Sequence, residues 1–126
     1  MRRVVVTGLG IVSSIGNNAE EVIDSLRHAR SGIVTADDYV RLGFRSQIHG
    51  SLKLDLDAVV DRRARRFQGD GAGYCWVAMT QAIADAGLTE KEISNPRTGL
   101  IVGSGGPSTK VIVEAAATAK ERGPKR

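Results

Sequence analysis

The chain has 126 residues, of which 41% are hydrophobic and 25% are charged, and this is enough for one domain with a hydrophobic core. A formal net charge of +4 favours an acidic partner, while an aromatic content of 4% argues against a stacking surface for single-stranded nucleic acid. The single cysteine excludes an internal disulfide, and no apolar run approaches the ~18–20 residues of a membrane span, so we expect a cytoplasmic protein that binds neither nucleic acid nor membrane.

The hydrophobic pattern predicts an α/β fold with at least partly parallel strands. The expected elements, in chain order, are a buried strand at 4–6, a glycine-rich loop, a helix at 19–29, short strands near 33–35 and 46–54, a helix from Asp57 to about Phe67, a buried helix at 70–86, a short helix after Thr89, a buried strand at 98–103 and a last helix to about Glu121. Asn17 or Asn18 caps the first helix, Thr89 and Glu92 form a capping box, and Ser108 or Thr109 caps the last.

A glycine pattern after the first expected strand suggests an alternative function. Residues 8–13 (GLGIVS) nearly match the dinucleotide-binding pattern GxGxxG, and Asp37 and Asp38 follow about where a ribose-binding carboxylate is needed. However, Ser13 replaces the third glycine, and the first helix begins too far along the chain to direct its N-terminus at a pyrophosphate. We therefore expect a tight turn here, with a nucleotide-binding module as the alternative function.

The residue types that most often carry catalysis give no signal in this sequence. Cys75 lies within an apolar helical stretch, so we expect a buried core cysteine rather than a nucleophile. His28 and His49 have no partner carboxylate motif, and neither predicts a catalytic or metal site. Residues 103–110 (GSGGPSTK) lack the Gly-Lys-Ser/Thr of a phosphate-binding loop. No catalytic residue, metal or cofactor is therefore expected in this chain.

Four arginines lie within little more than one turn of the helix expected after Asp57. Arg62, Arg63 and Arg66 share a side by the i, i+3/i+4 rule, with no acidic residue between them. Two interpretations explain this run of arginines equally well: a solvated charged face, and a binding surface for an acidic protein or a phosphate.

Four passages of the sequence, in this order and spacing, resemble the start of the β-ketoacyl-acyl-carrier-protein synthases of the type I branch. They are residues 5–17 (VVTGLGIVSSIGN), 30–33 (RSGI), 81–88 (QAIADAGL) and 97–106 (RTGLIVGSGG). The resemblance covers essentially the whole chain, but only about the first third of such an enzyme. It implies the thiolase fold, with residues 1–126 forming the N-terminal part of a five-layered αβαβα domain, usually within a homodimer.

The resemblance also implies a function for the parent protein. Enzymes of this family elongate fatty acids by condensing an acyl thioester with malonyl-acyl carrier protein, through a decarboxylative Claisen reaction. The cysteine that accepts the acyl group and the two assisting histidines have no counterpart in residues 1–126, so we expect the chain alone to be inactive. A non-catalytic interaction domain is a further alternative.

The resemblance also implies that this chain takes part in recognising the acyl carrier protein. The family docks its acidic acyl carrier protein on a basic helix, and Arg62, Arg63 and Arg66 match those positions, with Lys125 and Arg126 resembling a second basic patch. Gly105, Gly106 and Pro107 fall in a loop that lies near the acyl pocket and the dimer contact in the family. Pro107 replaces the usual glycine there, which leaves the acyl-chain preference open.

Overall fold

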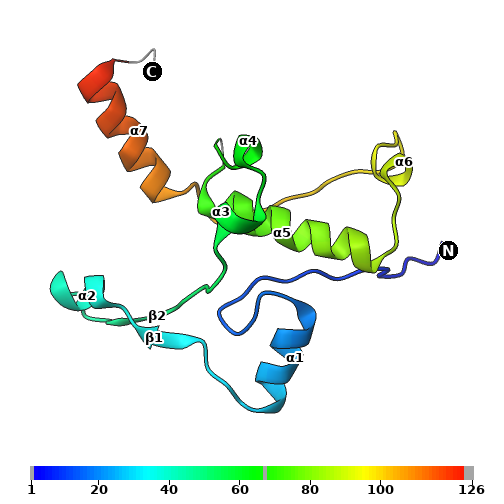
Figure 1. Ribbon diagram of the computed structural model, residues 1–126, viewed down its shortest axis with the longest axis horizontal. Coiled ribbons are helices and arrows are strands. Elements are labelled where there is room, and N and C mark those ends of the chain that lie inside the picture. Colours follow the sequence, from blue (N-terminus) through cyan, green and yellow to red (C-terminus); the bar gives the residue numbers. More distant parts are fainter. Residues whose placement is uncertain (1, 67, 124–126) are drawn as a thin grey trace.

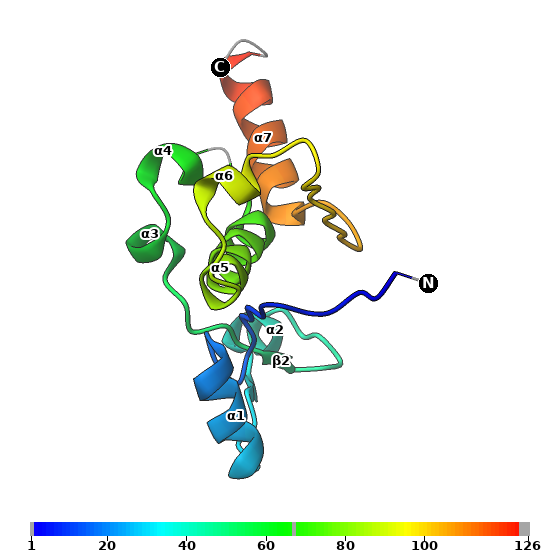
Figure 2. The same cartoon turned by 90° about the vertical axis from the view of Figure 1, so that its right-hand side faces the viewer.

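The fold is organised around one long helix, α5, which lies at its centre in a computed structural model that describes residues 2–66 and 68–123 (Figures 1 and 2). The elements are α1 (Ala19–Arg27), β1 (Ile33–Thr35), α2 (Asp37–Arg41), β2 (Ile48–Gly50), α3 (Leu56–Val59), α4 (Arg62–Arg65), α5 (Asp70–Asp85), α6 (Glu90–Ile93) and α7 (Thr109–Arg122). The N-terminal segment, α1 and the β1–β2 hairpin lie on one side of α5, and α3, α4 and α7 lie on the other.

Helix α1 confirms the prediction for residues 19–29, although it ends two residues earlier, at Arg27. The Asn18 side chain accepts a hydrogen bond from the backbone N–H of Glu21, and the Glu21 carboxylate accepts one from the N–H of Asn17 at 2.8 Å. These bonds satisfy donors that the first turn of a helix leaves free. Val22 and Ser25 are the buried residues of α1, and they fix the face that packs inward.

The β1–β2 hairpin confirms the two short strands but not their expected direction. The two strands pair antiparallel, with Val34 opposite His49, so the prediction of partly parallel strands is wrong for the sheet in the described part of the chain. Helix α2 was not expected. Asp37 and Asp38 form its first turn, where their charges favour the positive end of a helix, and this explains an acidic pair that resembled a ribose-binding site.

The single helix expected from Asp57 to Phe67 is wrong, because the chain forms two short helices here. Val60 has extended backbone angles (φ −101°, ψ 137°) and separates α3 from α4. The caps are Asp55 for α3 and Asp61 for α4, each through its own carboxylate. Phe67, the expected end, lies outside the described residues.

Two segments expected to be buried strands are extended but unpaired within the described residues. Val4, Val5 and Val6 are 68–93% exposed, and Leu100, Ile101 and Val102 are 61–96% exposed. β-branched side chains favour an extended backbone, but a strand requires a hydrogen-bonded neighbour. Neither segment has one in the described chain, so both strand predictions are wrong.

Helix α5 begins at the expected residue and ends one residue early, at Asp85, but it does not show the expected burial. Among its described residues only Gly73 is buried, against the side chain of Leu56 from α3. Cys75 is exposed, so the prediction of a buried core cysteine is wrong. The helix is flanked by segments that leave much of its apolar surface open.

The local signals that follow α5 in the sequence are confirmed. Gly87 adopts φ +66°, Thr89 and Glu92 form the capping box of α6, and Ser108 caps α7.

Candidate functional site

The glycines that resemble a nucleotide-binding turn serve instead to bring the N-terminal segment against α5. A methyl group at Gly8 would overlap the carbonyl oxygen of Ala82, and one at Gly10 would overlap that of Ala78. Both glycines therefore face helix backbone and leave no room for a pyrophosphate. The tight turn expected at residues 8–13 lies instead at residues 13–16, where Ser13 and Gly16 exchange backbone hydrogen bonds, and Gly8 and Gly10 have a packing role.

Polar side chains of α5 hold the same segment in place. The Gln81 side chain accepts a hydrogen bond from the backbone N–H of Ile11 at 3.0 Å and donates one to the carbonyl oxygen of Asn17 at 2.6 Å. The Asp85 carboxylate accepts a bond from the N–H of Leu9 at 2.9 Å. No pattern in the sequence predicts these contacts, because they join residues 64 to 76 positions apart.

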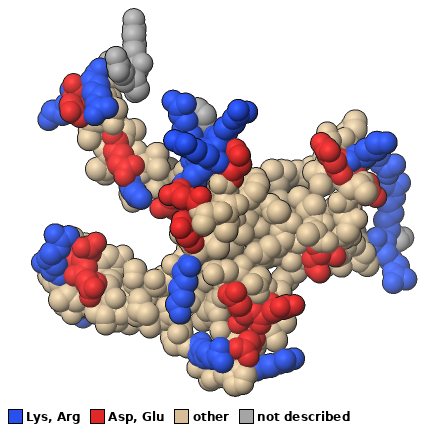
Figure 3. All heavy atoms as spheres, viewed as in Figure 1, with Lys and Arg blue, Asp and Glu red and all other residues tan. Residues whose placement is uncertain are grey.

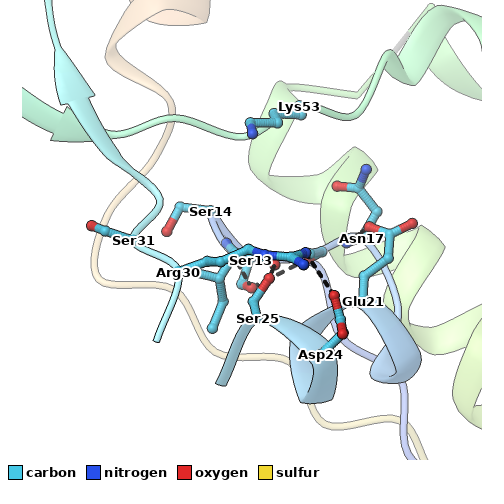
Figure 4. Close-up of a pocket in the computed structure, with 11 residues that line it drawn as sticks. Ser13, Ser14, Asn17, Glu21, Asp24, Ser25, Arg30, Ser31 and Lys53 are labelled. Atoms are coloured by element: carbon cyan, nitrogen blue, oxygen red, sulfur yellow. Dashed lines mark hydrogen bonds and ion pairs between the residues drawn. The ribbon is translucent and has the colours of Figure 1, made fainter. Parts of the chain in front are cut away.

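A polar cavity of ≈ 250 Å³ lies between this segment, α1 and the residue Lys53 that follows β2 (Figure 4). Its charged groups are balanced, and several are already paired. Arg30 donates to Asp24 at 2.6 Å, and the Ser25 hydroxyl donates to the carbonyl oxygen of Ile15 at 2.6 Å. Lys53 lies across the cavity from these groups. The cavity is thus explained by the packing of α1, with no surplus of charge to hold a ligand.

The arginines predicted to bind an acidic partner lie at α4, where Figure 3 shows basic side chains gathered on one surface of the molecule. Arg62, Arg63 and Arg66 are all exposed. Within residues 2–66 and 68–123, Arg62 and Arg63 take part in no ion pair, so their guanidinium groups face solvent. Lys125 and Arg126, the second predicted patch, lie outside the described residues.

Arg65 differs from the other three arginines because it turns inward. Its Nε donates to Asp57 at 3.0 Å, its Nη2 donates to Asp70 at 2.6 Å, and its Nη1 donates to the carbonyl oxygen of Gln68 at 2.6 Å. Lys110 of α7 approaches the same Asp70 carboxylate at 3.7 Å. These contacts join α3, α4, α5 and α7 through one network of charged groups.

The charges of this network alter the titration of its members. The hydrogen bond from Arg65 lowers the pKa of Asp70, with a smaller contribution from the nearby charge of Lys110. The same hydrogen bond raises the pKa of Arg65, and the bond to Asp57 adds to this effect. Asp70 is therefore ionised, and Arg65 charged, at neutral pH. Sequence spacing placed Arg65 apart from the other arginines but could not identify its partners, which lie on separate elements.

The loop predicted to lie near an acyl pocket borders an open hollow of ≈ 580 Å³. Gly106 and Pro107 line it together with Cys75 and Val111, so the structure brings the loop, α5 and α7 to one place. Gly105 has open space around it and does not line the hollow.

The two histidines lie on different elements and line neither the cavity nor the hollow. His28 directly follows α1 and contacts Asp24 at 3.0 Å. His49 lies in β2, with its ring 5.8 Å from that of Tyr39. The structure thus places the two histidines on separate elements, each beside a different partner.

Neither a metal site nor a membrane span is found among the described residues. No cluster of three or more His, Cys, Asp or Glu side chains there is arranged to hold an ion. None of the helices in residues 2–66 and 68–123 is both long and apolar enough to cross a bilayer.

Comparison with known sequences gives one family. The family model described as "Beta-ketoacyl synthase, N-terminal domain" matches residues 1–125. The chain is 47% identical over 126 residues to 3-oxoacyl-[acyl-carrier-protein] synthase 1 of Haemophilus influenzae, covering 99% of this chain and 31% of that protein. It is 52% identical over 114 residues to the synthase 1 of Escherichia coli, covering 90% of this chain and 28% of that protein.

A solved structure supports the same relationship. The chain superposes on a β-ketoacyl synthase from Burkholderia phymatum with a TM-score of 0.77 and 30% sequence identity, covering 98% of this chain and 31% of that one. The chain therefore spans about three-tenths of the length of the relatives it matches.

Proposed function

Because the chain belongs to the β-ketoacyl synthase family, we propose that its full-length protein is a 3-oxoacyl-acyl-carrier-protein synthase of fatty-acid elongation. The family and the thiolase-like fold expected from the sequence are both confirmed. The observation that carries the proposal is the 47–52% identity to two proteins named as synthase 1. Such identity, spread over 90–99% of the chain, extends well beyond a shared turn or helix motif.

Residues 1–126 would then form the N-terminal part of the ketosynthase domain, with catalysis supplied elsewhere in the protein. The reaction we propose transfers an acyl group to a cysteine, decarboxylates malonyl-acyl carrier protein and joins the two in a Claisen condensation. We do not assign that role to Cys75, because neither of the two hollows that it lines has a histidine among its lining residues. The 126-residue chain alone is accordingly expected to be inactive.

The contribution of this chain is recognition of the acyl carrier protein. Arg62, Arg63 and Arg66 offer an exposed basic surface on α4, and an acidic carrier fits that charge. Lys125 and Arg126 are proposed to extend it. Gly105, Gly106 and Pro107 are proposed to lie near the acyl pocket and the contact between two subunits, in a homodimeric enzyme of the cytoplasm. The open hollow beside Gly106 and Pro107 supports this assignment.

Reversing two charges in the full-length protein tests the docking surface. Arg62→Glu with Arg63→Glu should raise the KM for carrier-borne substrate roughly tenfold at low salt, because opposed rim charges otherwise speed association. The KM for a small acyl thioester without a carrier should change much less. The increase should shrink between ~0.05 and ~0.5 M salt, because the Debye length falls severalfold.

Arg41→Glu is the matched control, since Arg41 is an exposed arginine on α2 that pairs with Asp38. This variant should keep the wild-type KM for the carrier. Wild-type kinetics for Arg62→Glu with Arg63→Glu at low salt would show that these arginines are only a solvated face. No condensation of acyl thioester with malonyl-acyl carrier protein by the full-length protein would refute the proposed reaction itself.

A further inference from the structure

Helix α4 presents the proposed docking arginines, yet it is too short to fix its own direction. It has four residues, and a single helical turn gains little stability from its own hydrogen bonds. The Asp61 carboxylate caps its start by accepting from the N–H groups of Arg63 and Ala64. A local cap of this kind stabilises the turn but does not set how the turn sits on the rest of the molecule.

Arg65 supplies the missing connection. Its guanidinium donates to three groups on three segments: Asp57 in α3, the carbonyl oxygen of Gln68 before α5, and Asp70 in the first turn of α5. Its side chain is 21% exposed, which contrasts with its exposed neighbours Arg62 and Arg63. A planar guanidinium has donors in fixed directions, so three bonds at once define the orientation of α4 relative to α3 and α5.

The charge of Arg65 is meanwhile compensated. Two carboxylates contact it, at 3.0 Å and 2.6 Å, so the group adds little positive potential for a distant acidic partner. Any influence of Arg65 on such a partner therefore has to pass through the position of α4 rather than through direct attraction.

We propose that Arg65 is a positioning residue for carrier docking, whose bonds to Asp57, Gln68 and Asp70 hold α4 so that Arg62 and Arg63 meet the acidic partner together. This inference rests on the proposed function. Asp70 contributes to the same positioning, because it also contacts Lys110 and so links α7 to the network around Arg65.

Replacing one arginine at a time by lysine separates position from charge. Lysine keeps the charge but has no fork of donors, so it cannot reproduce three bonds in fixed directions. In the full-length protein, Arg65→Lys should raise the KM for carrier-borne substrate about fivefold, whereas Arg62→Lys should raise it less than about twofold, since a rim contact depends mainly on charge. Arg65→Lys should also leave the salt dependence of that KM as steep as in the wild type, because no docking charge is lost.

Asp70→Asn provides a second test, because positioning and simple electrostatics predict opposite changes in the KM for carrier-borne substrate. The substitution makes the surface more positive by one charge, so a partner that responds to net charge alone would bind better. Positioning predicts the reverse, a rise of about threefold in the carrier KM, because a neutral amide holds Arg65 less firmly than a carboxylate does. Arg41→Lys, on the separate helix α2, is the control and should match the wild type.

The outcomes distinguish this inference from the function on which it rests. If Arg62→Glu with Arg63→Glu raises the carrier KM but Arg65→Lys and Asp70→Asn behave as wild type, Arg65 has no positioning role and the docking surface stands. If Arg65→Lys raises the KM for a small acyl thioester in the same proportion as for the carrier, its effect is a general loss of structure and the inference is overturned. If Arg62→Glu with Arg63→Glu leaves the carrier KM unchanged, the proposed docking surface is refuted, and the inference about Arg65 is refuted with it.

Discussion

Two glycine-rich segments flank α5, and their glycines have opposite surroundings. At residues 8–16 the glycines lie against helix backbone, where Gly8 and Gly10 leave no space for even a methyl group. At residues 99–106 a methyl group added to any of the glycines would have no atom within 4 Å, and none of these glycines has a positive φ. The glycines of the first segment are thus close-packed, whereas those of the second have open space around them.

The hydrogen bonds of the two segments differ in the same way. Gln81 and Asp85 reach from α5 to the backbone of the first segment, across 64 to 76 positions of sequence. In the second segment, the Ser104 hydroxyl bonds to the backbone of Gly106, two residues away. Glycine content alone therefore does not identify a tightly packed segment, and the difference can be tested by substitution.

The largest effect is expected from Gly10→Ala in the full-length protein. The new methyl group would overlap the carbonyl oxygen of Ala78, so the segment or α5 must move, and we expect a loss of roughly 3 kcal/mol in the free energy of unfolding. Denaturant unfolding measures it. Gly71→Ala in α5 is the control, because it meets no atom within 4 Å and should not destabilise. Equal stability of the two variants would mean that Gly10 is not in close contact with the helix.

An intermediate effect is expected from Gln81→Leu. It removes both the acceptor for the N–H of Ile11 and the donor to the carbonyl oxygen of Asn17, leaving two part-buried backbone groups unpaired. The expected loss is about 2 kcal/mol in the free energy of unfolding. Thr80→Val is the neighbouring control, because the Thr80 hydroxyl donates to the carbonyl oxygen of Trp76 within α5 itself. This substitution should change the free energy of unfolding by less than about 0.5 kcal/mol.

Local features of the fold were predictable from the sequence. The cap of α1 at Asn18, the capping box of Thr89 and Glu92, and the cap of α7 at Ser108 each depend on residues within four positions of one another, and each is confirmed. Helical spacing also separated Arg65 from the exposed arginines, although whether those bind a carrier stays a prediction.

Most of the features that failed depend on distant partners. Residues 4–6 and 100–102 carry the side chains of strands, but pairing is a property of the neighbouring chain and not of the segment. The break at Val60 has a local signal that the sequence analysis missed, because Asp61 caps α4 through its own carboxylate, whereas the exposure of Cys75 depends on which segments cover α5. The partners of Arg65 are 3, 5 and 8 positions away, without a shared helical face to predict them.

The smallest effect is expected from Gly103→Ala in the 126-residue chain. Gly103 has no positive φ, and the added methyl group would have no atom within 4 Å, so neither strain nor overlap results. The free energy of unfolding should change by less than about 0.5 kcal/mol, and towards a gain, because alanine restricts the unfolded chain more than glycine does.

Repeating the Gly103→Ala substitution in the full-length protein sharpens the comparison with Gly10. A loss above about 1 kcal/mol there, but not in the 126-residue chain, would mean that chain outside residues 1–126 packs on Gly103, so that both glycine segments are close-packed in the complete protein. A comparable loss already in the 126-residue chain would contradict the open surroundings of Gly103 and end the contrast between the two segments.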